Sequence, residues 1–87
     1  MRSYTYVLWS EQFCRKYVGM TENLERRLNE HNSGKMKSTK AFRPWKIVYF
    51  EEFETKQEAR KRELYFKSAA GRKFLKIRIG PVVQRIE

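Results

Sequence analysis

The chain has 87 residues, of which 40% are hydrophobic, and this suffices for one domain with a modest core. Lys and Arg number 20 against 10 Asp and Glu, and the formal net charge of +10 favours a polyanionic partner, chiefly nucleic acid. The one cysteine, Cys14, excludes an internal disulfide, and no apolar run resembles a signal peptide or reaches the roughly 20 residues of a membrane span. We therefore expect a cytoplasmic protein with no membrane partner.

The pattern of β-branched, aromatic and charged residues predicts three strands and three helices. In order, we expect strands over 3–9 and 14–20, a helix over 22–31, a loop over 35–43, a strand over 44–53, a helix over 56–68 and a short helix over 72–79. The order β-β-α-β-α-α predicts an α/β (α+β) sandwich, with a three-stranded, mostly antiparallel sheet flanked by helices. We expect a single domain over 1–87, with its core at about 3–77 and a C-terminal tail at 80–87.

Residues that begin or end helices support these bounds. Thr21 is the expected N-cap of the first helix, and Gly34 follows its last turn. Thr55 and Glu58 have the spacing of a capping box at the start of the second helix. Gly71 is expected to end that helix.

The second predicted helix carries a carboxylate on its apolar stripe. The stripe is formed by Ala59 and Phe66, and Glu63 lies between them. A carboxylate facing inward is costly unless it is paired or bound to a cation. The simpler interpretation is an ion pair of Glu63 with Lys67, in the same way that Glu58 is placed to pair with Arg62.

The first predicted helix places Arg27 and His31 beside its apolar stripe, four residues apart. The simpler interpretation is an arginine stem that covers apolar surface and a histidine with a structural role. Tyr6 and Tyr17, in the first two strands, are likewise explained as half-buried strand aromatics. Taken one at a time, each residue favours a structural role.

Taken together, these residues supply the parts of a metal-assisted phosphodiester hydrolase. Such a reaction needs a divalent cation, an activated water and a positive charge for the transition state. Mg²⁺ can take a single protein carboxylate, here Glu63, with waters and phosphate as its other ligands. Arg27 carries the planar donor fork that suits phosphate, and a tyrosine phenol is placed to activate water.

Several segments carry a resemblance to a known family. They are "YTYVL", then "KYVG" with Tyr17 eleven residues after Tyr6, followed by "ERRLNEHNSG", "RPWKIVYFEEF", "EARKRELYFKS" and "GRKFL". In this order they resemble the GIY-YIG nuclease family, from about Tyr4 to Leu75. The likeness is greatest to small stand-alone bacterial members, which are related to the incision subunit of excision repair, a DNA repair pathway.

The resemblance implies a set of site residues and an activity. It implies catalytic roles for Tyr6, Tyr17, Arg27 and His31, a metal-binding role for Glu63, and a motif glycine at Gly19. The implied activity is that of an endonuclease that hydrolyses DNA with one Mg²⁺ or Mn²⁺ ion and a tyrosine-assisted water. The alternative is a nucleic-acid-binding module that keeps the fold without catalysis.

The chain departs from the family pattern at three positions. Tyr4 stands where the first motif has glycine, and Thr5 stands where it has isoleucine. Met20 follows Gly19, where several family members carry a lysine. This leaves one cation fewer at the phosphate, which bears on the rate more than on the type of reaction.

The predicted loop between the first helix and the third strand is rich in cations. They are Lys35, Lys37, Lys40 and Arg43. We expect this loop to bind the nucleic-acid backbone without reading bases, with the hydroxyls of Ser38 and Thr39 as further phosphate donors. A solvated surface loop is the simpler alternative.

Overall fold

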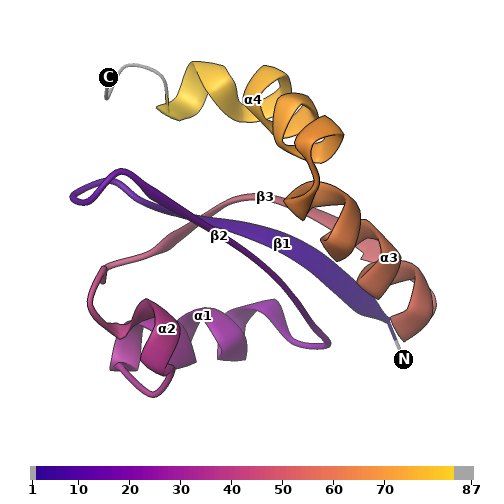
Figure 1. Cartoon of the computed structure of the whole chain (residues 1–87). Coiled ribbons are helices and arrows are strands. Elements are labelled where there is room, and N and C mark those ends of the chain that lie inside the picture. Colours follow the sequence, from indigo (N-terminus) through magenta and orange to yellow (C-terminus); the bar gives the residue numbers. More distant parts are fainter. Residues whose placement is uncertain (1, 84–87) are drawn as a thin grey trace.

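The structure is a computed structural model that describes residues 2–83, with side chains for residues 2–80. Its elements are β1 (Ser3–Ser10), β2 (Arg15–Thr21), α1 (Leu24–Ser33), α2 (Lys37–Lys40), β3 (Lys46–Phe53), α3 (Lys56–Lys67) and α4 (Ala69–Val83). One sheet lies between two groups of helices (Figure 1). The predicted fold class, a three-stranded sheet flanked by helices, is therefore confirmed.

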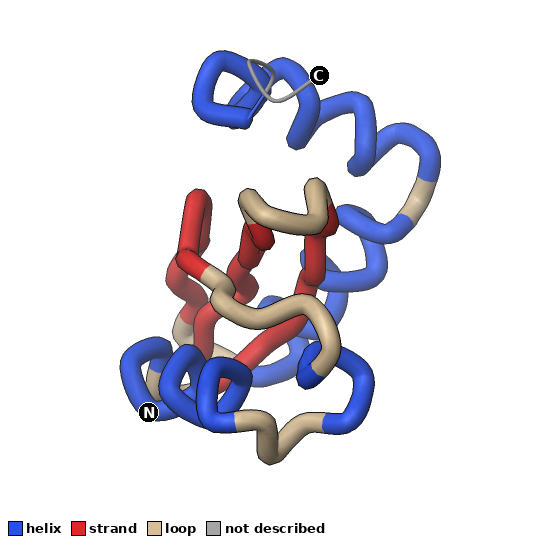
Figure 2. The backbone as a smooth tube through the Cα atoms, turned by 90° about the vertical axis from the view of Figure 1, so that its left-hand side faces the viewer, coloured by secondary structure: helices blue, strands red, loops and turns tan. Residues whose placement is uncertain are grey.

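The sheet has the strand order β2-β1-β3, and both pairings are antiparallel. Figure 2 shows the strands of this sheet side by side, with helices around them. In the central strand, Tyr6 lies opposite Gly19 of β2 and Phe50 of β3. The pairing of β1 with β3 shifts register between Val7 and Leu8, which marks a β-bulge. Because β1 is central, β2 and β3 each present one strand edge that pairs with no other strand of this sheet.

Helix α1 begins two residues later than predicted. Its N-cap is Asn23, whose side chain accepts a hydrogen bond from the backbone N–H of Arg26 at 2.9 Å. Thr21 ends β2 instead, and its hydroxyl accepts from the backbone N–H of Asn23 at 3.1 Å. Gly34 closes the helix in a left-handed conformation, with φ of 86°, as its position predicts.

The predicted loop over 35–43 contains the single helical turn α2, so its description as a loop was wrong in part. Its N-cap, Met36, makes no side-chain capping hydrogen bond, which explains why the sequence carries no capping signal there. The turn is held instead by tertiary contacts, since Thr39 is fully buried. The third strand starts at Lys46 instead of Pro44.

Helices α3 and α4 are joined by a sharp turn at Ser68. The predicted capping box at Thr55 and Glu58 is confirmed at the start of α3. Gly71 does not end α3, as predicted, but lies within α4. A Cβ atom on Gly71 would lie 1.8 Å from the carbonyl oxygen of Tyr65, so only glycine allows α4 to cross so close to α3.

Helix α4 is longer than the predicted short helix over 72–79. It runs from Ala69 to Val83, so the first residues of the predicted 80–87 tail are helical. The remainder of that tail, residues 84–87, lies outside the described residues.

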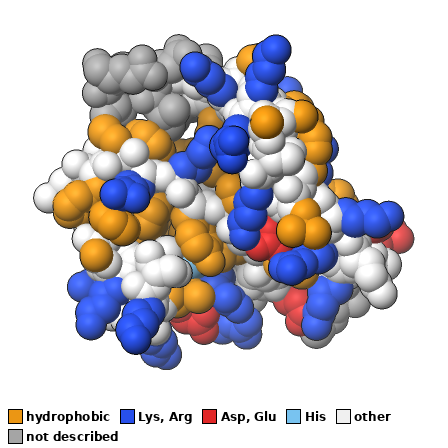
Figure 3. Space-filling model, in the orientation of Figure 1, with side chains coloured by type: hydrophobic (Ala, Val, Ile, Leu, Met, Phe, Trp, Pro, Cys, Tyr) orange, Lys and Arg blue, Asp and Glu red, His pale blue; other side chains and the backbone are white. Residues whose placement is uncertain are grey.

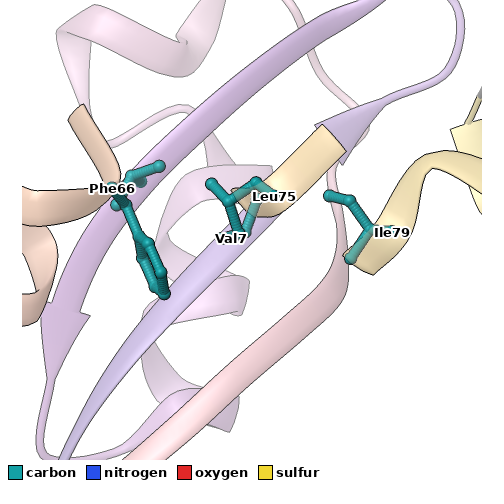
Figure 4. Packing of buried hydrophobic residues seen from close by; sticks show 5 residues of the cluster. Val7, Phe66, Leu75 and Ile79 are labelled. Carbon is teal, nitrogen blue, oxygen red and sulfur yellow. The ribbon is translucent and has the colours of Figure 1, made fainter. Parts of the chain in front are cut away.

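Each face of the sheet has its own core. Helices α3 and α4 cover one face, where the buried cluster comprises Val7, Val18, Phe66, Leu75 and Ile79 (Figure 4). Helices α1 and α2 lie on the opposite face, where the buried cluster comprises Tyr6, Leu8 and Trp45. The alternation of side chains along β1 sends Tyr6 and Val7 to opposite faces, as the sequence predicts.

Candidate functional site

The site is built around a glycine in the edge strand β2. A Cβ atom on Gly19 would lie 2.6 Å from the hydroxyl oxygen of Tyr6 and 3.1 Å from Cε2 of Tyr17. The missing side chain therefore makes room for both phenol rings. Tyr6 and Tyr17 pack with ring centroids 6.5 Å apart, and the structure brings these two predicted site residues together.

His31 extends this cluster from α1. It is fully buried, and its Nε2 lies 2.9 Å from the Tyr6 hydroxyl. Its Nδ1 lies 2.8 Å from Oγ1 of Thr39, whose hydroxyl donates in turn to the carbonyl of Met36. This pattern places the imidazole proton on Nδ1, which donates to Thr39, and leaves Nε2 to accept the Tyr6 hydroxyl. The result is a buried chain of hydrogen bonds from α2 through α1 to β1.

Burial shifts the pKa of Tyr6 and the pKa of His31 in the directions that favour the uncharged form of each group. Loss of solvation raises the pKa of Tyr6, and the neighbouring Tyr17 adds to the rise. Loss of solvation also lowers the pKa of His31, and the positive charge of Arg27 lowers it further. At neutral pH both groups are uncharged, so the hydrogen bond joins a phenol to a neutral imidazole.

Arg27 lies on the same helix as His31, beside the phenols. Its Nε is 3.1 Å from Oε1 of Glu30, but among the described residues this buried Nε makes no hydrogen bond of acceptable geometry. The side chain lines a hollow of about 290 Å³ together with Met20 and Lys56. An arginine that is half-buried, incompletely hydrogen-bonded and open to a hollow is suited to bind an anion.

Glu63 lies on α3, behind the sheet from Arg27 and His31. It is 6% exposed, and its two carboxylate oxygens lie 3.2 Å from Nη1 of Arg60 and 3.0 Å from Nζ of Lys67. The predicted Glu63–Lys67 ion pair is thus confirmed. The predicted pair of Glu58 with Arg62 is wrong.

Arg62 turns toward β3 and away from the first turn of its own helix. Its guanidinium donates to both oxygens of Glu51, at 2.7 and 3.1 Å, and stacks over Phe66. The carboxylate of Glu58 accepts instead from the backbone N–H of Thr55 in the capping box. The partner of Arg62 is thus Glu51, a carboxylate on a strand. Residue spacing along the helix carries no information about such a partner.

The edge of β2 joins these two sets of residues. Met20 lines the Arg27 hollow and also a second hollow of about 520 Å³ with Arg60 of α3. Tyr17 lines a third hollow of about 290 Å³ with Lys67. The two cations that bind Glu63 therefore border the same strand edge as Tyr17 and Met20, and the site extends around this edge.

The predicted nucleic-acid-binding cations surround α2. The four of them, Lys35, Lys37, Lys40 and Arg43, are all exposed. Figure 3 shows Lys and Arg side chains over the part of the surface that α1 and α2 form. Thr39 differs from the prediction, because it is fully buried and bound to His31, so its hydroxyl cannot contact phosphate.

Sequence reasoning missed two residues of this arrangement, Lys56 and Arg26, and gave Thr39 a different role. Thr39 holds Nδ1 of His31, and Lys56 and Arg26 line the hollow beside Arg27. Thr39 and Lys56 carry no signal in spacing or composition, because they reach the site only through tertiary packing. Arg26 is adjacent to Arg27, and the clustering of the two arginines was the only available signal.

Two kinds of feature are not found in the described part of the chain. Within residues 2–83, no three His, Cys, Asp or Glu side chains form a group that could hold a metal ion. Within the same residues, no helix has both the length and the apolar character needed to cross a membrane.

Comparison with known proteins identifies the class. Residues 2–76 match the family model described as the GIY-YIG catalytic domain, and the chain therefore belongs to the GIY-YIG family, a family of nucleases. The match includes Tyr6, Gly19 and Arg27, and it ends within α4.

The relatives are bacterial proteins of the UPF0213 group. The chain is 52% identical over 52 residues to a UPF0213 protein of Clostridium perfringens, across 59% of this chain and 56% of that protein. It is 43% identical over 58 residues to the UPF0213 protein YazA of Bacillus subtilis, across 66% of this chain and 59% of that protein. These alignments span less than two thirds of each relative.

A solved structure shares the fold. The solution NMR structure of a UPF0213 protein from Bacillus halodurans superposes with a TM-score of 0.56 at 30% identity. The superposition covers 94% of this chain and 90% of that one.

Proposed function

We propose that this protein is a metal-dependent endonuclease that hydrolyses phosphodiester bonds in DNA. The observation that carries the proposal is the arrangement around the β2 edge. There, two phenols meet over Gly19, Arg27 opens onto a hollow, and a buried carboxylate lies on the helix behind the sheet. Membership of a nuclease family supports the same reading.

The two tyrosines take different parts in this proposal. Tyr17 is the more exposed phenol and faces the reacting water, whereas Tyr6 is 2% exposed and positions it from within the fold. The Tyr17 phenolate, formed by prior loss of its own proton to solvent, accepts a proton from the water while the water oxygen bonds to phosphorus. The bond from phosphorus to the leaving oxygen breaks on the opposite side, and a solvent water protonates that oxygen. His31 is a positioning residue in this scheme, because it is fully buried and acts through the Tyr6 hydroxyl.

Arg27 stabilises the phosphate as negative charge builds up on its oxygens. Its guanidinium already borders a hollow that also receives Arg26 and Lys56. These two neighbours place positive charge around Met20, the position where several family members carry a lysine. Glu22 also lines this hollow, so the cations from α1 and α3 offset the departure at Met20 in part.

The donor set around Glu63 fits one Mg²⁺ or Mn²⁺ ion. Both are hard cations that accept a single protein carboxylate when waters and phosphate supply the other oxygens. Glu63 would hold the ion, and the exposed side chains of Arg60 and Lys67 can move from its oxygens to phosphate. The bound ion would supply charge neutralisation at the phosphate.

The α2 cations extend the binding surface away from this centre. Arg43 donates from Nε to the carbonyl of Lys40 at 2.8 Å, which fixes its stem against the turn. Together with Lys35 and Lys37 it would hold backbone phosphates, and such contacts carry no sequence information.

Cleavage of a circular single-stranded DNA tests the proposal. A circle has no ends, so its conversion to a linear form with Mg²⁺ or Mn²⁺ reports endonuclease activity. We expect Glu63→Gln to abolish this conversion while the far-UV circular dichroism spectrum stays unchanged. The fold should be retained because the two partners of Glu63, Arg60 and Lys67, are largely exposed. In the variant, water can solvate their charges.

Glu54→Gln is the matched control, because it removes the same charge from an exposed position before α3. Cleavage by Glu63→Gln at the wild-type rate would refute the metal-binding assignment. A wild-type protein that binds DNA but never cuts it, with either metal, would establish the non-catalytic binding module instead.

A further inference from the structure

We propose that the tip of the β1–β2 hairpin is a stacking site for an unpaired nucleobase next to the scissile phosphate, with Phe13 as its platform. Phe13 is 43% exposed at this tip, where a large apolar side chain has no structural need to meet water. The inference rests on the proposed nuclease function, because it names the form of nucleic acid that the site takes.

The geometry leaves a face of Phe13 open. Its ring meets Phe42 with centroids 5.5 Å apart and an angle of 75° between the planes, so the two rings do not stack on each other. Phe42 is itself anchored in the core with Leu8 and Trp45. Phe13 is therefore held from one side by a fixed aromatic ring and is open to water on another.

A cation lies on this aromatic pair. The guanidinium carbon of Arg15 lies 4.3 Å from the centroid of the Phe42 ring. Arg43 follows Phe42 directly in the chain, and both Arg43 and Lys40 are exposed. Figure 3 shows hydrophobic side chains gathered at the end of the molecule where Figure 1 places the hairpin, with a Lys or Arg side chain among them. Aromatic rings among cations are the composition that binds single strands, by stacking on bases and contacting phosphates.

The platform is continuous with the proposed active site. Every second residue of β2 faces the α1 side of the sheet, and these residues include Arg15, Tyr17 and Gly19. At about 3.3 Å per residue, Arg15 and Gly19 are about 13 Å apart. One strand bound with its phosphate at Tyr17 can therefore run along β2 and bring a neighbouring base to Phe13. A paired base has both faces covered by its neighbours, so only an unpaired base can stack there.

A second exposed phenylalanine offers an internal comparison. Phe50 is 49% exposed and meets Tyr4 at a ring distance of 6.0 Å and an angle of 73°, much like the contact of Phe13 with Phe42. It lies in β3 next to Glu51 and Glu52, however, whose charges are balanced by Arg62 and Arg2, so this neighbourhood carries no excess of positive charge to attract a nucleic-acid backbone. The two sites match in exposure and ring geometry, but they differ in local charge and in their place in the fold, a hairpin tip against a strand.

Binding measured by fluorescence anisotropy, with a chelator present to prevent cleavage, tests this inference. The probes are a labelled single-stranded oligonucleotide and a duplex of the same sequence. We expect Phe13→Ala to weaken single-strand binding by about 5- to 100-fold and duplex binding by less than about twofold. Phe13→Trp should retain single-strand binding, and Phe50→Ala should bind both probes like the wild type.

Two further measurements separate stacking from charge. Phe13→Ala should leave the slope of log K against log salt unchanged, whereas Arg15→Gln should reduce the slope for single strands by about 0.7. An abasic site moved along the oligonucleotide should weaken wild-type binding at one position and have no effect there on Phe13→Ala.

Equal losses for single strand and duplex, or wild-type binding by Phe13→Ala, would overturn the stacking site. Either result would leave the Glu63 experiment unaffected, because that experiment measures cleavage. Conversely, a Phe13 effect on binding would stand even if no DNA were ever cut.

Discussion

The two faces of the sheet bury different kinds of side chain. Beneath α3 and α4, the core is apolar, and Phe66 stacks on Phe74 with centroids 5.9 Å apart and only 11° between the rings. Beneath α1 and α2, the core contains a tyrosine, a histidine and a threonine, joined by hydrogen bonds of 2.9 and 2.8 Å. Both faces exclude water, but the buried chain of hydrogen-bonded side chains, Tyr6, His31 and Thr39, lies on the second.

This difference shows how a domain of this size combines stability with chemistry. Burial of apolar side chains on one face contributes stability without requiring specific partners. On the other face, each buried polar atom needs a partner, because an unsatisfied one costs about 1–3 kcal/mol. Thr39 and His31 satisfy each other and the Tyr6 hydroxyl, so the α1 face is stable only as a complete network.

The largest expected effect on stability comes from the apolar face. Phe66→Ala should lower the free energy of unfolding by about 3–5 kcal/mol, because it leaves a cavity among buried side chains. Urea denaturation measures this loss. Tyr6→Phe, on the other face, leaves Nε2 of His31 without its partner, so it should lower the free energy of unfolding by about 1–3 kcal/mol, less than Phe66→Ala, and should lose cleavage. If Tyr6→Phe cut DNA normally, the division of roles between the two faces would be refuted.

Arg27 tests the catalytic role of the α1 face. Arg27→Ala should lower kcat by about 10²–10³-fold with little change in KM, because its charge acts on the transition state. Arg27→Lys should not restore the rate, since lysine lacks the planar fork. Arg26→Ala, a loss of the same charge one residue away, is the control and should have the smaller effect. A change confined to KM would make Arg27 a binding residue only.

Thr39 tests whether the hydrogen-bond network holds the α1 face together. Thr39→Val keeps the shape of the side chain but removes the partner of His31 Nδ1. The free energy of unfolding should fall by about 1–3 kcal/mol, and the cleavage rate should fall with it. Ser38→Ala removes an exposed neighbouring hydroxyl and should change stability by less than about 0.5 kcal/mol. Equal stability for both variants would contradict the network.

The smallest expected effect is the pH dependence that His31 gives to stability. The pKa of His31 is lowered in the folded protein by burial and by Arg27, below the value of 6.5 that applies to the unfolded chain. As pH falls below 6.5, the unfolded state therefore binds more protons at His31 than the folded state does. The stability that neutral His31 contributes to the fold is present above pH 6.5 and is lost below it.

Unfolding free energies should consequently decrease from pH 7 toward pH 5, by at most about 1.4 kcal/mol per pH unit. His31 is the single histidine of the chain, so His31→Gln should flatten this slope. A slope that persisted unchanged in His31→Gln would assign the effect to carboxylates instead.

The sequence by itself determined the order of the main elements and indicated most of the candidate site residues. Alternation along β1 assigned Tyr6 and Val7 to opposite faces, and the capping box located the start of α3. These features depend on neighbours within a few residues, which the sequence displays directly. The ordered motifs likewise indicated Tyr17, Gly19, Arg27 and Glu63 as candidates, through the resemblance to a family.

Only the tertiary structure decided which of these residues meet, and through which partners. Thr39 was expected at the surface but lies buried against His31, because α2 folds under α1 without any capping signal of its own. Gly71 was expected to end a helix but instead allows α4 to cross α3. Arg62 was expected to pair with Glu58 but binds Glu51, which is eleven residues away in the sequence. In each case the deciding contact joins separate elements, and local spacing holds no information about such contacts.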